Sequence, residues 1–526
     1  MASHQIQTER QSRRRWIRRA AVAGVMVFLL SPYLLYRPPP PPDGFNVRSP
    51  PRRIPEDRIR LLTDSTAYDA RRGERVFDQR IFDAVLDMIR SAQRAVYLDF
   101  FLWNSWTGSI PERHRNLSGE LADALIRKKA ESPDLPILVF TDPINRVYGQ
   151  EENDFYEAMR AAGICVVFTR MDRLPDPNRL YAAPASVYGP VLSRIPGLRQ
   201  WLSRRSLPHP LETKGRKVTA RHYGRLLFFK ANHRKLAIAD GPGGWRALVT
   251  SFNPADGSSS HSNLGLLMDG SIARDALALE LDCVAWSAAS PDHVLEPTPG
   301  ACAQVMDALR NLLKEPREPE PAVGAWAEWL TEESIARKAE TMLNNCGRGD
   351  TVRLAMFYLS DRPLIAALER ADERGADIRI ILDANRDAFG RTKNGIPNRP
   401  IAAMLMARSE RTGGRIGIRW ADTHGEQFHP KALSIVRSGG GTAELLCGSA
   451  NWTRRNVRNF NLEANVYLGD AHEISAEYAA WFDRCWNNSD GLSRTLPYEA
   501  FAVSGFERGW KAVLGHWLES TGLSTF

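Results

Sequence analysis

Two stretches of this sequence, His233-Arg-Lys-Leu-Ala-Ile-Ala-Asp240 and His429-Pro-Lys-Ala-Leu-Ser-Ile-Val436, decide how the chain folds. Each begins with a histidine and a lysine two residues apart and continues as an apolar run, which is typical of a buried strand. The chain has 11 histidines and 11 lysines in 526 residues, so chance alone would give roughly 0.2 such His-x-Lys triplets. Two triplets, each leading into a strand, therefore indicate a repeated unit.

A Ser-x-Asn triplet follows each strand at nearly the same distance. A glycine-containing turn and a second apolar strand lead to Ser251-Phe-Asn253 in the first copy and to Ser449-Ala-Asn451 in the second. The histidine precedes the asparagine by 20 residues in the first copy and by 22 in the second. The two copies are therefore predicted to build the same local structure.

A further asparagine extends the repeat, because Asn263 and Asn461 each follow their triplet by ten residues. Counted in this way, Gly265 stands in the first copy where Glu463 stands in the second. Each copy thus lacks one acidic residue that the other copy has, since the second copy also has valine in place of the first motif's aspartate.

The sequence before each motif repeats as well. In each half, a helical periodicity is followed by an apolar strand, a helix and a second apolar strand. The four strands span residues 95–102 and 136–142 in the first half and 352–358 and 378–383 in the second. Strands that alternate with helices favour an α/β fold with a sheet covered on both faces. We therefore predict two similar lobes, residues 58–315 and 322–526, separated by a proline- and acid-rich segment.

The N-terminal segment has the composition of a membrane anchor. Residues 1–42 contain seven arginines and one glutamate, a net charge of +6 out of +9 for the whole chain. We predict a basic cytoplasmic flank at 1–19, a transmembrane helix at 20–36 and a proline-rich linker at 37–57. The rest of the chain would lie on the outer side of the membrane, or be secreted if the segment were a cleaved signal, including one of the twin-arginine type. Export would permit disulfides, but the spacing of the six cysteines reveals neither a pairing nor a zinc pattern.

A basic insertion distinguishes the first lobe from the second. From residue 96 to His233 the first lobe has 137 residues, whereas from residue 352 to His429 the second lobe has 77. The extra residues fall at about 170–223, and residues 170–235 hold 15 Lys or Arg against three acids. Apolar residues also recur there at helical spacing, a combination that suits anionic lipid headgroups. The alternative is a packed loop with a solvated basic face.

With these features the chain resembles the phospholipase D superfamily, whose signature is His-x-Lys-x4-Asp followed by a Gly/Ser-Asn motif, twice in one chain. The first copy is complete from His233 to Asp240, whereas Val436 replaces the acid in the second. The resemblance covers roughly residues 58–526 and is closest to the bacterial phospholipase D and cardiolipin-synthase-like branch. It implies two α/β lobes with mixed sheets and an active site at their pseudo-twofold interface, with no cofactor and no metal ion.

The resemblance also implies roles for the repeated residues. Cleavage of a phosphodiester by double displacement needs a nucleophile, an acid for the leaving group and fixed positive charge. One histidine would attack phosphorus, the other would act as acid and base, and the lysines would hold the phosphoryl oxygens. Because the family pairs a histidine with a carboxylate of the opposite lobe, Glu463 would orient His233 as nucleophile and leave His429 as acid and base. The predicted catalytic residues are His233, Lys235, Asp240, Asn253, His429, Lys431, Asn451 and Glu463, with Ser251 and Ser449 as substrate-binding residues.

The predicted function is that of a membrane-anchored phosphodiesterase that hydrolyses phospholipid headgroups or transfers them to an alcohol, acting as a monomer. A cardiolipin-type synthase, in which a lipid alcohol replaces water, carries the same motifs. A nuclease is a second alternative because a basic cleft also binds phosphate backbones, but the anchor makes lipid the nearer substrate. A catalytically degenerate binding protein is a third alternative, suggested by Val436 and Gly265.

Overall fold

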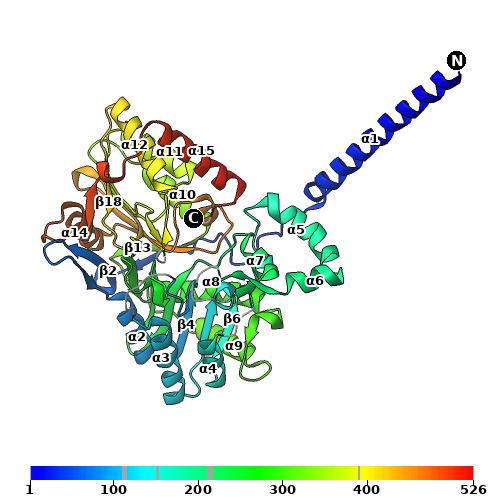
Figure 1. The fold of residues 1–526 in the computed structure, drawn as a ribbon. Helices are drawn as coiled ribbons and strands as arrows, with labels where there is room; N and C mark the ends of the chain where they lie inside the picture. The colour runs from blue at the N-terminus through cyan, green and yellow to red at the C-terminus, as the bar shows by residue number, and fades with distance from the viewer. Residues whose placement is uncertain are drawn as a thin grey trace.

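Two nine-stranded sheets organise the part of the chain that the computed structural model describes, which is residues 2–108, 115–149, 153–209, 212, 217–388 and 391–524. The first sheet and its helices form the lower half of the body in Figure 1, and the second sheet and its helices form the upper half. Strands of the two sheets contact each other where the halves meet.

The first sheet has the strand order β12-β6-β5-β4-β9-β10-β11-β2-β3. Its strands are β2 (Ile59–Asp69), β3 (Glu74–Asp78), β4 (Ala95–Phe100), β5 (Ile137–Thr141), β6 (Cys165–Phe168), β9 (Lys235–Gly241), β10 (Gly244–Thr250), β11 (Asn263–Asp269) and β12 (Val294–Leu295). Strands β4, β5 and β6 run parallel, and β4 pairs antiparallel with β9. Every residue of β4 and β5 is buried, as expected for strands covered on both faces.

The second sheet repeats this arrangement with the order β1-β13-β21-β20-β19-β14-β15-β18-β22. Its strands are β1 (Arg52–Ile54), β13 (Ala325–Thr331), β14 (Thr351–Met356), β15 (Asp377–Leu382), β18 (Ile416–Ala421), β19 (Lys431–Val436), β20 (Ala443–Gly448), β21 (Ala464–Gly469) and β22 (Thr495–Pro497). Strands β14, β15 and β18 run parallel, and β14 pairs antiparallel with β19. The predicted α/β fold with two similar lobes and mixed sheets is confirmed.

Helices cover both sheets, and hydrophobic clusters fill the layers between them. The helices of the two lobes are α2 (Ile81–Ser91), α3 (Leu117–Glu131), α4 (Asp154–Ala161), α8 (Ser271–Ala288), α9 (Ala301–Lys314), α10 (Glu333–Asn344), α11 (Arg362–Glu373), α12 (Asn398–Thr412), α13 (Arg454–Val457), α14 (His472–Asn487) and α15 (Gly505–Thr521). One cluster contains residues of both lobes, including Leu266 of β11 and Leu445 of β20. This shared core holds the two lobes together.

Residues 46–54 belong to the second lobe, although residues 37–57 were expected to be a linker. Strand β1 pairs antiparallel with β13, which sets Arg52 opposite Ala327. The backbone N–H of Asn46 donates to the Glu332 carboxylate at 2.7 Å. A strand of three residues beside prolines has too short a pattern to be recognised by periodicity, which explains the difference.

The N-terminal helix α1 (Ala2–Leu35) projects from the body (Figure 1). Within it, Arg13–Leu35 is long and apolar enough to cross a membrane, a property that a signal sequence shares. The insertion folds into α5 (Arg179–Leu192), α6 (Pro196–Leu202), β7 (Arg205–Pro208), β8 (Lys217–Thr219) and α7 (Ala220–Leu226). Its residues 210–211 and 213–216 lie outside the described residues.

Helix α5 packs against the C-terminal end of α1 (Figure 1). The rings of Phe28 and Tyr188 stack with 4.6 Å between their centroids, and the Ser31 and Tyr188 hydroxyls lie 2.8 Å apart. The buried Tyr36 hydroxyl donates to Asp176. The insertion is therefore attached to the last turns of α1.

A disulfide joins Cys165 of β6 to Cys302 of α9, with 5.4 Å between the two Cα atoms. The other cysteines, Cys283, Cys346, Cys447 and Cys485, are buried thiols. Structural disulfides persist in oxidising compartments.

Candidate active site

The two His-x-Lys motifs meet at the interface of the lobes. Each lysine is the first residue of its strand, Lys235 of β9 and Lys431 of β19. The backbone N–H of His233 donates to the Leu462 carbonyl of the second lobe at 2.9 Å. The equivalent N–H of His429 donates to the Ser262 carbonyl of the first lobe, also at 2.9 Å. Each histidine is therefore held by the opposite lobe.

Both motifs arrange lysine, histidine and an aromatic ring in the same way. Each lysine Nζ donates to the carbonyl of its own histidine at 2.7 Å, because residues two apart on a strand share a face. Phe101, just after β4, lies 4.8 Å from the His233 ring. Phe357, just after β14, lies 4.9 Å from the His429 ring. The phenylalanines wall the site and keep both lysines buried.

Glu463 orients His233 as the family resemblance implies. Its Oε1 accepts from the Nδ1–H of His233 at 2.7 Å. The carboxylate also accepts from the Ser449 hydroxyl and from the Asn456 amide. Because Nδ1 carries the proton, His233 presents an unprotonated Nε2 for reaction.

His429 has a neutral partner, Asn263, in place of a carboxylate. The Asn263 Oδ1 lies 3.3 Å from Nδ1 of His429 and accepts from the Ser251 hydroxyl at 3.2 Å. The Asn263 amide nitrogen donates to the Asp64 carboxylate at 3.2 Å and to the His261 carbonyl at 3.1 Å. Since both of these partners are acceptors, the amide oxygen faces the histidine, and Nδ1 of His429 is its donor.

Asn263 is therefore the structural counterpart of Glu463, and the expectation that Gly265 holds this place is wrong. Ser251 N–H donates to Leu264 O as Ser449 N–H donates to Ala464 O, both at 2.9 Å. The residue before each of these carbonyls is Asn263 in one lobe and Glu463 in the other. The connection from serine to this residue is two residues longer in the second lobe, so counting equal spacings misaligned the copies.

Burial shifts the pKa values of the candidate catalytic groups. Burial lowers the pKa of His233 to about 4, although Glu463 opposes the shift. Burial, with Lys431 and Lys235 nearby, lowers the pKa of His429 well below its usual range. Burial also lowers the pKa of Lys235 to about 7 and that of Lys431 strongly. Burial removes the water that would stabilise the positive charge of these side chains. A bound phosphate group would stabilise that charge instead, so the site favours an anion.

The pKa of Glu463 is lowered even though burial alone would raise it. Its closeness to His233 and Lys235 and its hydrogen bond from Asn456 outweigh the burial. The carboxylate is therefore ionised beside His233. His233 thus has a negatively charged partner, whereas the partner of His429 is the neutral Asn263.

Two aspartates at strand ends hold the backbone just before the histidines. Asp142, after β5, accepts from the backbone N–H of Asn232 at 2.7 Å. Asp383, after β15, accepts from the N–H of Phe428 at 2.9 Å. Burial raises the pKa of Asp142 to about 7 and that of Asp383 to about 6. The sequence motifs did not predict this role, although each aspartate is the last residue of a strand predicted from the sequence, 136–142 or 378–383.

The remaining predicted residues divide into two groups. Asn253 and Asn451 are both buried. The Asn253 Oδ1 accepts from the Leu102 N–H at 3.3 Å, whereas the Asn451 Oδ1 has no hydrogen-bond partner among the described residues. Ser251 and Ser449 support Asn263 and Glu463 and do not face the histidines directly.

Asp240 lies outside the reacting cluster, which corrects its prediction as a catalytic residue. It follows Lys235 by five positions on β9, about 16 Å along a strand, and its carboxylate pairs with Arg94 at 3.2 Å. Val436 has the same place at the end of β19, opposite Thr351. Asp240 fixes the end of a strand, so valine can replace it in the second lobe.

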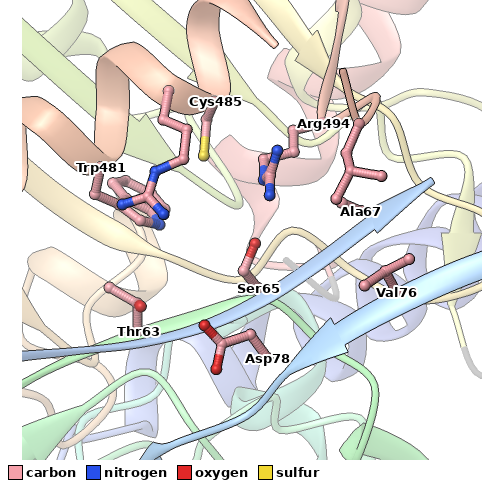
Figure 2. A pocket seen from close by; sticks show the side chains of 10 residues that line it. Thr63, Ser65, Ala67, Val76, Asp78, Trp481, Cys485 and Arg494 are labelled. Carbon is pink, nitrogen blue, oxygen red and sulfur yellow. The ribbon is translucent and has the colours of Figure 1, made fainter. Parts of the chain in front are cut away.

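No group of three or more His, Cys, Asp or Glu within the described ranges could hold a metal ion. Figure 2 shows a small pocket between the β2–β3 hairpin and α14, and neither His233 nor His429 lines it. Asp78, Trp481 and Arg494 are among its lining residues, and its volume is about 50 Å³. It has room for water but not for a lipid headgroup.

Replacing Asn263 with aspartate is expected to raise the pKa of His429. The new carboxylate would stand where the neutral amide accepts from Nδ1, and Asp64, whose pKa burial already raises to about 7, would hold the proton that the two carboxylates share. An adjacent opposite charge raises a histidine pKa by about 1–3 units. If His429 acts as an acid, the alkaline limb of the pH profile of kcat/KM moves to higher pH by about one unit or more. Turnover of a soluble phosphodiester across the pH range measures this shift.

Asn461→Asp is the matched control. Its Oδ1 accepts from the Ala231 N–H at 2.9 Å, as a carboxylate oxygen also can, and among the described residues it forms no hydrogen bond with His429. The alkaline limb should stay in place in this variant. An Asn263→Asp enzyme with lower kcat but an unmoved limb would show that Asn263 supports the fold without positioning His429.

Comparisons with known proteins found a matching family model and similar solved structures. Residues 340–486 match the family model described as "Cardiolipin synthase, PLD-like domain". No curated protein sequence matches the chain. The crystal structure of phosphatidylserine synthase from Haemophilus influenzae Rd KW20 is similar, with 12% identity, a TM-score of 0.54 and coverage of 90% of this chain and 96% of that chain. Nuc, a phospholipase D family member from Salmonella typhimurium, is 19% identical over 32% of this chain and 99% of its own, with a TM-score of 0.24.

The family model covers the second motif, and the fold shared with the synthase extends over most of both lobes. Both His-x-Lys pairs lie at the pseudo-twofold interface, each held by the opposite lobe. The matched model and the fold shared with the synthase support membership of the chain in the phospholipase D superfamily.

Proposed function

We propose that the protein is a phospholipase D-type phosphodiesterase that cleaves or exchanges phospholipid headgroups through a phosphohistidine intermediate. The observation that carries this proposal is the meeting of two buried His-Lys pairs, with an ionised Glu463 beside one histidine only. Both histidines are held in place by the opposite lobe, which favours a catalytic protein over a degenerate binding protein.

In the first step Nε2 of His233 attacks phosphorus. The N–P bond forms, the bond to the leaving oxygen breaks, and protonated His429 gives its proton to that oxygen. Water or an alcohol then attacks phosphorus, gives its proton to His429 and releases His233. Lys235 and Lys431 hold the phosphoryl oxygens during both steps.

The different partners of the histidines support this division of roles. The charge of Glu463 stabilises the positive charge that develops on His233 as Nε2 bonds to phosphorus. The neutral Asn263 gives His429 no such stabilisation, so its imidazolium is the stronger acid. The proposed roles follow from the partners of the two histidines, Glu463 for His233 and Asn263 for His429.

We further propose that α1 anchors the body to a membrane with the N-terminus in the cytoplasm. The arginines before the apolar part of α1 favour this orientation, and the Cys165–Cys302 disulfide suits an outer location. Attachment of α5 to the end of α1 would bring the insertion to the bilayer surface. There the exposed Val191, Ile195 and Trp201, which are 60%, 49% and 58% exposed, could enter the interface.

A cardiolipin-type phosphatidyltransferase is the second candidate, favoured by the name of the matched family model. The chemistry of the first step is identical, and only the attacking group of the second step differs. The acceptor therefore has to be identified by its product.

The test uses the purified full-length protein in nanodiscs of phosphatidylcholine, phosphatidylethanolamine and phosphatidylglycerol, with and without glycerol. We expect phosphatidic acid if water is the acceptor and cardiolipin if a lipid alcohol is. New phosphatidylglycerol that depends on added glycerol would identify transfer to a small alcohol. A wild-type enzyme that leaves all three lipids intact but cleaves nucleic acid would contradict the proposal and favour the nuclease.

A further inference from the structure

A cavity of about 1030 Å³ lies where the end of α1, the insertion and the first lobe meet. Leu35 and Arg37 line it from α1 and the residues that follow, Val187 and Arg225 from the insertion, and Pro143 from the first lobe. Its lining thus combines apolar side chains near the end of α1 with arginines. This volume is in the range of ligand sites.

The cavity is strongly basic. Its lining includes six Lys or Arg and three Asp, a net charge of +3. The acids are already engaged in part, because Asp172 pairs with Arg170 at 2.8 Å and Asp176 pairs with Lys230.

Three arginines of the lining have no such carboxylate partner in the described part of the chain, so their positive charge is available to an anionic ligand. Arg37, Arg221 and Arg225 form no ion pair with a carboxylate of the described residues. Arg225 donates to the Tyr148 carbonyl at 2.8 Å, and Arg37 to the Leu34 carbonyl at 3.3 Å. Burial and the nearby Arg225 and Arg221 lower the pKa of His222, which also lines the cavity, to about 4. Guanidinium groups of this kind suit phosphate oxygens, which they bind in bidentate fashion.

The cavity adjoins both the anchor and the active site. Tyr36, at the end of α1, is 5% exposed and forms part of its wall. On the other side, Pro143 directly follows Asp142, the carboxylate that holds the backbone before His233. Lys230, also in the wall, precedes His233 by three residues. A molecule in the cavity would therefore lie between the bilayer surface and the catalytic histidines.

We propose that this cavity binds the phosphate headgroup of an anionic membrane phospholipid on its way from the bilayer to the active site. The inference rests on the proposed function and adds the substrate class and its entry route. The lipid source follows from the place of the cavity, because its rim includes the last residues of the apolar helix. Acyl chains can remain beside α1 while the phosphate meets Arg37, Arg221 and Arg225.

Photocrosslinking tests the site in the full-length protein. Nanodiscs of phosphatidylcholine would contain a small fraction of phosphatidylglycerol with a photoactivatable headgroup, and crosslinked peptides would be mapped by mass spectrometry. We expect crosslinks on residues 35–39, 143–149 and 221–230 in the wild type. Arg221→Glu/Arg225→Glu should lower them at least about fivefold, because each substitution replaces attraction by repulsion.

Arg411→Glu/Arg415→Glu is the control, since it makes the same charge change at two exposed arginines of the second lobe. This variant should keep the crosslinks, and an unchanged unfolding temperature in both double variants would confirm that they fold. Equal crosslinking in the wild type and in Arg221→Glu/Arg225→Glu would overturn the site.

Two further arms separate the outcomes. Loss of the crosslink in the presence of millimolar glycerol 3-phosphate would identify a soluble phosphate ester as the ligand and overturn the lipid assignment, whereas an unchanged crosslink would support it. Hydrolysis of bis(p-nitrophenyl) phosphate by the wild type tests the catalytic proposal alone. If it fails while the crosslinks persist, the proposed function is wrong but the lipid site stands.

Discussion

Replacing His233 with alanine is expected to lower turnover by at least about 10³-fold, the scale of losing a catalytic nucleophile. His233 pairs through Nδ1 with the buried Glu463 carboxylate, and Lys235 donates to the His233 carbonyl. The loss should appear in kcat with lipid substrates and with soluble phosphodiesters alike. Release of product in nanodiscs and release of p-nitrophenol in solution measure it.

The position of the phosphohistidine adduct shows which of the two histidines is the nucleophile. A p-nitrophenyl ester needs little help from an acid, so His429→Ala should still form the phosphohistidine on His233 but release it slowly. Quenching in base and mapping by mass spectrometry would locate the phosphoryl group. An adduct on His429 in the wild type would reverse the proposed roles.

His516→Ala is the control for the loss of a histidine as such. This side chain is exposed on α15, where its Nε2 lies 3.5 Å from the Ser520 hydroxyl. Turnover by the variant should match the wild type.

Replacing Arg234 with methionine is expected to destabilise the protein by about 3–5 kcal/mol, because it leaves buried carboxylates without their cation. Arg234 stands between His233 and Lys235 in the motif, but its side chain points away from the site and is fully buried. It pairs with Glu280 of the first lobe at 2.9 Å and with Glu332 of the second at 2.8 Å. The shift of the denaturant midpoint and of the unfolding temperature measures the loss.

Arg437→Met is the matched control. Its guanidinium also bridges two acids, Asp350 at 3.3 Å and Glu444 at 2.5 Å, but its side chain is 16% exposed and both acids belong to one lobe. Water can replace part of those interactions, so the cost should be smaller. Equal costs for the two variants would mean that Arg234 does not link the lobes.

The two-lobed fold was predictable because the repeated strands are buried on both faces and therefore appear in the sequence as apolar runs. Residues 95–102 and 352–358 are apolar throughout most of their length, and each is followed by matching elements. Strand β1 escaped prediction because three residues carry no periodicity. Its place depends on β13, which lies more than 270 residues away along the chain.

The active site was predictable where a residue's role follows from its position on one strand. Lys235 and Lys431 share a face with their histidines because they are two residues apart. The pairing of Asn263 with His429 was not predictable, because strand register across the lobes decides it. The Ser262 carbonyl and the His429 N–H fix that register, and no local pattern records a hydrogen bond between such distant residues.

Between α1 and β2 the chain joins the two sheets in the reverse of their order along the sequence. After leaving α1, the backbone first joins the outer edge of the second sheet through β1 and only then enters the first sheet. On the way, the Asn46 N–H and the Glu463 N–H bind the two oxygens of the same carboxylate, Glu332. Glu332 also pairs with Arg234 of the first lobe. One carboxylate therefore links the segment after α1, both lobes and Glu463, the partner of His233. Neither lobe is a separable module, and the catalytic body begins near Asn46, well before its first long strand.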